Sequence, residues 1–402
     1  MPALPATLHA EAAAAAHPGA RRRRRRLLRA VAAGLAGAAL LAACASLGPV
    51  DYYWQGAAGE IDLLARSEPI SEAIGNADAA LAERLARVQA IRAFASRRLG
   101  LPDNGSYKRY ADLGRRFVTW NVFATPKLSL EPRQWCFPIA GCVDYRGYFD
   151  ETAARREAMR LEAEGEDIYI GGVPAYSTLG WFDDPVLSTF IHWPETEVAR
   201  LVFHELAHQL LYVKDDSVFN ESFATTVEEA GLRRWLAAQK NPRLDAEAAR
   251  AERLRRVFRH LVRTTRAKLV QVYASALDPT AKEVAKRDAF ASMKAAYEAA
   301  KAGEPGLAGY DRWFAHSPNN ASLAAVGIYT DRIPAFRELL REEAGDLPRF
   351  YGRVRAVAAM AKPARDQVLD AAAERGRAYA LAEGSAAIQG DPLPTTPAGE
   401  AH

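Results

Sequence analysis

Histidine and cysteine are scarce in this chain, which has eight histidines and three cysteines in 402 residues. No histidine lies between Tyr52 and Phe190, so a metal site in that stretch would have no imidazole ligand. The sequence also has no internal repeat and no glycine-rich phosphate loop, which excludes repeat architectures and phosphate-loop nucleotide chemistry. The apolar run from Leu27 to Leu41, about 15 residues, is shorter than the roughly 20 that a membrane-spanning helix needs.

An excess of basic residues is confined to the amino terminus. The whole chain carries a formal charge of +4, but residues 1–44 hold seven arginines and one acid, a net of +6, which leaves about −2 for the remainder. A nucleic-acid partner therefore has no support from charge. The overall composition, 49% hydrophobic and 25% charged, is that of a folded protein with one large domain or two smaller ones.

The basic run begins a segment with the three parts of an export signal. In "RRRRRRLLRAVAAGLAGAALLAACASL" a cationic stretch is followed by the apolar run and by small residues before Cys44. "LAAC" resembles the lipobox of bacterial lipoproteins, which implies a lipoprotein signal peptide over residues 1–44 and a lipid on Cys44. The protein would then be anchored to a membrane of the bacterial cell envelope and face the periplasm, and Ser46 favours the outer membrane. An ordinary signal peptide or a short membrane anchor is the alternative.

Export changes what the other two cysteines are expected to do. Cys136 and Cys142 are separated by five residues, and an even pair in an oxidising compartment predicts a disulfide that closes a small loop. Pro138 and Gly141 would let this loop turn tightly. A metal site is the alternative, but it would need further ligands nearby.

Periodicity divides the rest of the chain into helical and sheet-forming parts. Residues 45–114 are predicted to be mainly helical. Residues 115–193 predict one small mixed or antiparallel sheet, formed by "RRFVTWNVFATP", "VDYRGYFD" and "EDIYIGGVPAYST" and interrupted by a helix at "ETAARREAMRLEAEG". Two helices are expected at 194–240, further helices at 241–382, and a disordered tail at 383–402.

The chemistry-bearing motif lies in the first helix after this sheet region. In "TEVARLVFHELAHQLLYV" the apolar spacing is helical, so His204 and His208, four residues apart, project side by side and can bind one ion near 2.0 to 2.1 Å. Glu205 lies on the adjoining flank, where it can take a proton from the attacking water of a zinc hydrolase. The alternative is a helix in which both histidines only make hydrogen bonds.

A third ligand would distinguish the two interpretations. "KDDS" at 214–217 is expected to end the first helix and to cap a second one, which begins at "VFNESFATTVEE" and runs back past the first. Glu221 is the best candidate ligand on this second helix. Glu228 lies seven positions later on the same face and is the competing choice.

Two resemblances bear on this choice. "HELAHQ" followed by "VFNESFATTVE" resembles the gluzincin aminopeptidases related to aminopeptidase N, which implies His204, His208 and Glu221 as ligands of Zn²⁺ and Glu205 as the general base. The spacer of 12 residues before Glu221 is shorter than in that family, Ser222 replaces its glycine, and its Gly-x-Met-Glu-Asn motif has no counterpart.

A second resemblance covers most of the chain. The lipobox together with "CFPIAGCVDYRGYF", "GWFDDPVLSTF", "HELAHQLLYVKDDSVFNESFA" and "NNASLAAVGIYTD" is similar to a bacterial family of predicted zinc aminopeptidases that are often lipoproteins. The implied fold is α+β and predominantly helical, with one zincin-like metallopeptidase domain at 45–382 and the small sheet beside the active-site helix.

Several residues outside the motif are candidates for supporting roles. Such peptidases need a second donor to the oxyanion, for which Tyr329 is the first candidate and Tyr176 the second, with ordinary packing as the alternative; His316 is a weaker one. Asp183 and Asp184 could bind a substrate's ammonium group or simply form an acidic turn.

The predicted function is hydrolysis of peptides by a lipid-anchored zinc metallopeptidase, as a probable aminopeptidase. One rival is an envelope lipoprotein that binds metal and holds peptide without turnover. Another is a structural lipoprotein without metal. The presence of Glu205, which is not a ligand, favours the enzyme, since an inert metal site has little need for a base.

Overall fold

Helices dominate the chain, and the predicted α+β, predominantly helical class is confirmed. The computed structural model describes residues 50–137, 141–175, 177–328 and 332–389. The chain divides into two compact units, residues 1–54 and 55–402, and the first is described only over the first five residues of one helix. The account that follows concerns the second unit.

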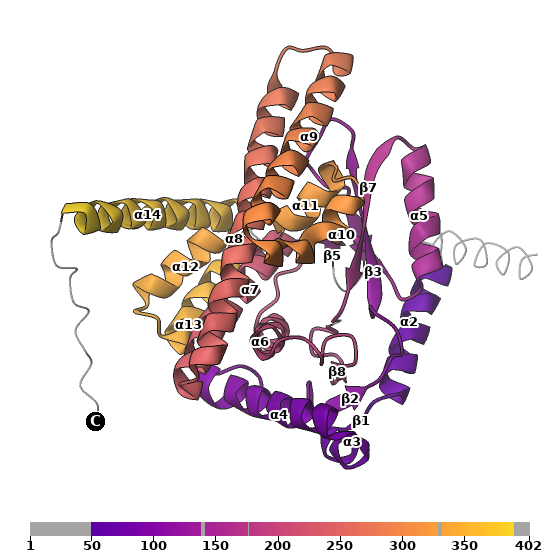
Figure 1. Ribbon diagram of the computed structural model, residues 1–402, viewed down its shortest axis with the longest axis vertical. Coiled ribbons are helices and arrows are strands. Elements are labelled where there is room, and N and C mark those ends of the chain that lie inside the picture. Colours follow the sequence, from indigo (N-terminus) through magenta and orange to yellow (C-terminus); the bar gives the residue numbers. More distant parts are fainter. Residues whose placement is uncertain (1–49, 138–140, 176, 329–331, 390–402) are drawn as a thin grey trace, which may run out of the picture. The chain divides into compact units, whose positions relative to one another are not determined.

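The helices lie where the apolar periodicity placed them. The amino-terminal ones are α2 (Val50–Ala65), α3 (Ile70–Asn76) and α4 (Ala79–Leu99), and α5 (Glu151–Ala163) interrupts the sheet region (Figure 1). The helices that follow are α6 (Glu195–Leu210), α7 (Ser217–Gln239), α8 (Pro242–Ala274), α9 (Pro279–Gly303), η1 (Pro305–Tyr310), α10 (Asp311–Ala315), α11 (Asn320–Ile328), α12 (Ile333–Glu342), α13 (Leu347–Ala358) and α14 (Lys362–Gln389).

The last helix, α14, continues to Gln389, past Glu383, where the disordered tail is predicted to begin. The segment "LAEGSAAIQ" is rich in alanine, whose helix propensity outweighs the single glycine within it. Residues 390–402 lie outside the described part of the chain.

The three predicted strands do form one sheet. In the described residues, β3 (Thr119–Pro126) lies at its centre and pairs antiparallel with β6 (Arg146–Tyr148) and β7 (Glu166–Val173). Two further small sheets were not predicted, because their strands are only two or three residues long. They consist of β1 (Glu68–Pro69), β2 (Arg109–Ala111) and β8 (Val186–Leu187), and of β4 (Trp135–Phe137) with β5 (Gly141–Val143).

Both faces of the β6-β3-β7 sheet are covered by helices. Phe123 of β3 packs with Ala321 and Ala325 of α11. Since side chains alternate along a strand, the buried Val122 and Ala124 face the other side, where α5 packs. Figure 1 shows the sheet between α11 and α5.

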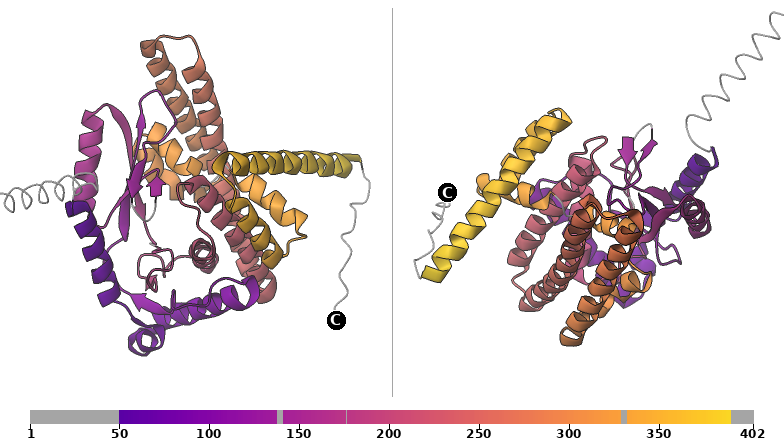
Figure 2. Two further views of the ribbon diagram at one scale, coloured as in Figure 1. Left: turned by 180° about the vertical axis from the view of Figure 1, so that it is seen from behind. Right: turned by 90° about the horizontal axis from the view of Figure 1, so that it is seen from above.

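The larger hydrophobic core surrounds α6 and α7, which carry the two sequence motifs. Phe203 of α6 and Phe223 of α7 are both fully buried there, together with Phe336 of α12 and Phe350 of α13. A second core lies between α8 and α9, which run as an antiparallel pair (Figures 1 and 2). Packed side chains of the larger core therefore hold the motif helices on several sides.

No helix in the described ranges is both long and apolar enough to cross a membrane.

Candidate metal centre

The first motif helix, α6, packs one flank against the core, and its flank with the histidines faces α7. Val202, Phe203 and Leu206 are buried in the core. His204 and His208 follow the four-residue spacing that places side chains one turn apart on one face. Their rings lie edge to face, with centroids 4.8 Å apart. The local helix geometry therefore brings the two imidazoles together.

The turn between α6 and α7 positions the second motif. Asp216 caps α7 by accepting a hydrogen bond from the Phe219 amide, which confirms the predicted cap in "KDDS". The Asn220 side chain then clasps the turn, because it accepts from the Val213 amide and donates to the Val213 carbonyl, both at 2.7 Å. Glu221 follows directly, so its backbone is fixed relative to the end of α6.

His204, His208 and Glu221 converge on one point. The two Nε2 atoms are 3.1 Å apart, Glu221 Oε2 is 3.1 Å from His204 Nε2, and Glu221 Oε1 is 3.5 Å from His208 Nε2. Three ligands bound to zinc at 2.0 to 2.1 Å in a tetrahedron would be about 3.3 to 3.4 Å apart. The spacing of these donors thus fits one ion of that size, and they form a group that could hold a metal.

Glu228 supports this cluster from behind. Its Oε2 lies 2.8 Å from Nδ1 of His204, and its Oε1 accepts from the Arg200 guanidinium. Because a carboxylate only accepts, Nδ1 of His204 carries the proton that it donates to Glu228, and Nε2, on the side of Glu221 and His208, is the nitrogen that could bind a metal. The structure therefore places the two competing glutamates on opposite nitrogens of one ring, with Glu221 on the ligand side.

The pKa shifts of His204 and Glu221 indicate that the cluster favours a positive charge at its centre. Burial alone would lower the pKa of His204, but its hydrogen bonds to Glu221 and Glu228 outweigh burial and raise it well above the ordinary value. Burial would raise the pKa of Glu221, but His208 and His204 lower it far below the usual range. His208 Nδ1 is buried and makes no hydrogen bond to a described residue.

Glu205 is half-buried beside the cluster. Burial raises its pKa, and the nearby His204 and His208 act in the opposite direction. A carboxylate with a raised pKa is a better proton acceptor, as a general base requires. Tyr107, fully buried with its hydroxyl unpaired among the described residues, is close enough to Glu205 for their charges to interact.

A buried polar network at the end of α6 was not predicted. Gln209, next to His208, accepts from Asn104 Nδ2 at 2.7 Å and donates to Ser106 Oγ at 3.1 Å and to Asp184 Oδ2 at 3.0 Å. These partners come from two loops that lie 20 residues or more before the motif. The only signal in the sequence was the glutamine of "HELAHQ" itself.

The remaining predicted residues fall into three groups. Asp184 is 2% exposed and accepts hydrogen bonds from Thr178, so it holds a turn and cannot meet a ligand directly. His316 is exposed and does not belong to the metal-binding group found among the described residues. Cys44, Tyr176 and Tyr329 lie outside the described residues.

The predicted disulfide is present. Cys136 and Cys142 are joined across the antiparallel pair β4–β5. The Cys142 amide also donates to Asp215 Oδ1 at 2.5 Å, which ties this hairpin to the turn between α6 and α7. The hairpin therefore lies against the segment that positions Glu221.

These features define an α+β protein with a largely buried His-His-Glu cluster that could hold a metal ion and a carboxylate beside it. The chain belongs to the family described as "Putative aminopeptidase", whose model matches residues 51–369. No curated protein and no solved structure matches it. Family membership indicates a peptidase that acts on peptides, and the match spans every residue of the cluster.

Proposed function

We propose that this protein is a zinc-dependent metallopeptidase with a zincin-like fold, acting as an aminopeptidase. The observation that carries the proposal is the convergence of His204, His208 and Glu221 at separations of 3.1 to 3.5 Å, with Glu205 beside them. Such a set provides three protein ligands and leaves a fourth position open, as catalytic zinc sites do. The family description supports peptide hydrolysis as the reaction.

His204, His208 and Glu221 would hold the ion, and Glu228 would fix the ring of His204 in the tautomer that binds metal. Bound zinc supplies Lewis-acid chemistry, because it acidifies water and polarises a carbonyl oxygen. Glu205 takes the proton from the attacking water and delivers it to the leaving amine. Its raised pKa suits both halves of this transfer. Tyr329, the proposed donor to the oxyanion, completes the set.

The cellular setting is also part of the proposal. A lipid on Cys44 would anchor the protein in the bacterial envelope, in the outer membrane as Ser46 favours, with the catalytic domain in the periplasm. The disulfide between Cys136 and Cys142 supports an oxidising compartment.

Metal analysis combined with peptidase assays tests the proposal. We expect one zinc per chain, hydrolysis of peptides by the wild type, and loss of hydrolysis with retained zinc in Glu205→Gln. Peptides with free and with blocked amino termini separate an aminopeptidase from an endopeptidase. Zinc without activity on a broad peptide library would favour the alternative, a lipoprotein that binds peptide without cleaving it.

A further inference from the structure

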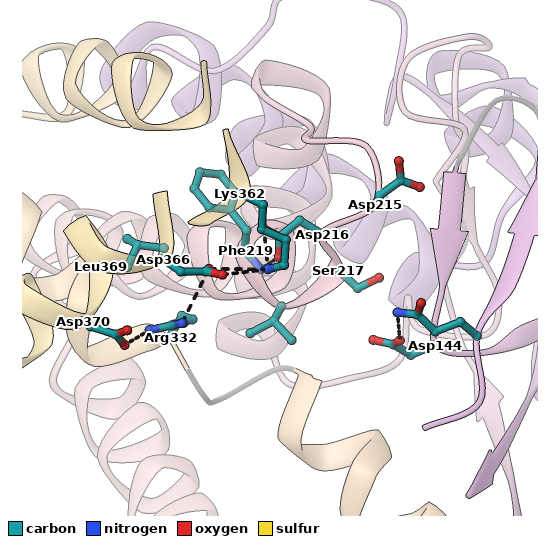
Figure 3. A pocket seen from close by; sticks show the side chains of 12 residues that line it. Asp144, Asp215, Asp216, Ser217, Phe219, Arg332, Lys362, Asp366, Leu369 and Asp370 are labelled. Atoms are coloured by element: carbon teal, nitrogen blue, oxygen red, sulfur yellow. Dashed lines mark hydrogen bonds and ion pairs between the residues drawn. The ribbon is translucent and has the colours of Figure 1, made fainter. Parts of the chain in front are cut away.

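A cavity of about 560 Å³ opens beside the second motif helix. Its walls come from four parts of the chain, namely the region of the disulfide hairpin with Gln134 and Asp144, the first turn of α7 with the residues just before it, Arg332 at the start of α12, and α14 with Lys362 and Asp366. Figure 3 shows Asp144 and Ser217 on one side of the open space and the charged residues of α14 on the other. Its volume lies in the range of cavities that hold small ligands or side chains.

This cavity adjoins the metal centre along α7. Ser217 and Val218 line it, and Glu221 is four and three positions further along the helix. Residues at these spacings lie on one face, one turn or ~5.4 Å apart along the axis. The far wall is joined to the same helix, because the Arg332 amide donates to Ser222 Oγ. The part of the cavity lined by Ser217 and Val218 is therefore one helical turn from a proposed zinc ligand.

The charges on the α14 side of the cavity neutralise one another. Arg332 pairs with Asp366 and Asp370. Asp216 accepts from Arg365 at 2.8 Å and lies 3.4 Å from Lys362. Three cations thus face three carboxylates there.

The hairpin side has no such balance. Asp144 is 7% exposed, and its only hydrogen bond from a described residue comes from the neutral amide of Gln134, at 3.1 Å. Asp215, near the same edge, accepts from the Cys142 amide. Neither carboxylate forms an ion pair within the described residues. Burial raises the pKa of Asp144 and the nearby charge of Asp216 adds to this effect, while the hydrogen bond from Gln134 and the more distant charge of Lys362 offset part of it. A carboxylate in that environment gains from an added cation.

We propose that this cavity is a substrate subsite that binds a cationic group of the peptide, with Asp144 as its main partner and Asp215 at its rim. The inference rests on the proposed peptidase function and adds the substrate class. The cation is either the side chain of lysine or arginine or the free amino terminus of the peptide. The balanced ion pairs on α14 hold the opposite wall and leave Asp144 free to meet the substrate.

Binding to the Glu205→Gln variant tests the subsite without requiring turnover. Tetrapeptides carry lysine or its uncharged analogue norleucine at each position in turn, and each is made with a free and with an acetylated amino terminus. In one of the two comparisons, lysine against norleucine or the free against the acetylated amino terminus, we expect the charged peptide to bind roughly 10-fold more tightly. The reason is that it forms a hydrogen bond between charged groups. A preference for lysine assigns the cavity to a side chain, and a preference for the free amine assigns it to the amino terminus.

Adding Asp144→Asn should remove this preference, and Asp215→Asn should reduce it in part. Asp288→Asn, an equal change of charge at an exposed position on α9, is the matched control and should keep it. Zinc content and thermal stability are measured for each variant, because they show whether the fold and the metal centre are retained. Equal binding of charged and uncharged peptides, or a preference that survives in the Asp144→Asn and Asp215→Asn double variant, would overturn the subsite. A wild type that binds lysine peptides but cleaves none would instead overturn the peptidase proposal.

Discussion

Replacing Glu228 by glutamine should weaken zinc binding although Glu228 is not a proposed ligand. Its two oxygens serve two partners, since Oε2 lies 2.8 Å from His204 Nδ1 and Oε1 accepts from Arg200. Glutamine has a single acceptor oxygen, so one of the two partners loses its hydrogen bond. A hydrogen bond to a charged group is worth ~1.5 to 3 kcal/mol, which corresponds to a zinc Kd ~10- to 100-fold weaker.

Competition with a chelator of known affinity measures this Kd. Glu229→Gln is the control, because Glu229 is the next residue on α7 and pairs with Arg337 instead of the metal cluster. We expect the control to bind zinc like the wild type, and Glu228→Gln to regain most of its activity once zinc is saturating. Equal zinc affinity in the two variants would refute the view that Glu228 orients His204.

Three further predictions concern stability and substrate binding. Burial and then Asp184 raise the pKa of Glu60 to about 7, so the folded state holds this proton more tightly than the unfolded state and wild-type stability falls between about pH 4.5 and 7. Glu60→Gln has no such proton to lose, so at pH 8 it should be ~2 to 3 kcal/mol more stable than the wild type, whereas at pH 4.5 the two should be equally stable. Urea unfolding at both pH values measures the difference. The same difference at both pH values would contradict the prediction. Gln209→Ala removes one hydrogen bond from each of three partners, of which Ser106 and Asp184 are buried, and should cost ~2 to 3 kcal/mol in the same assay, whereas a change under ~0.5 kcal/mol would argue against the network. Replacing Cys136 and Cys142 by serine should raise the KM for peptides several-fold while zinc content stays at wild-type level, because the hairpin borders the cavity and holds no ligand; loss of zinc would contradict this assignment.

Local patterns were sufficient to predict most of the elements around the site. The helical periods at 151–163 and 195–210 and the strands at 119–126 and 166–173 depend on neighbouring residues, and they appear where the sequence indicated. The short strands of the other two sheets carry too few residues for a period. Their pairing depends on distant partners, such as Tyr110 with Val186. The network of Gln209 could not be predicted for the same reason, because its partners come from loops remote in sequence.

The sequence by itself determined that His204 and His208 present two nitrogens to one point and that Glu205 lies beside them, because helix geometry fixes side chains four residues apart. It favoured Glu221 as the third ligand but kept Glu228 as the competing choice, since residues seven apart share a face. Only the packing of α7 against α6 separated them. That packing places Glu221 against Nε2 of His204 and Glu228 against Nδ1, and it also forms the cavity at the first turn of α7. Such relations depend on the angle and offset between two helices, which no local pattern encodes.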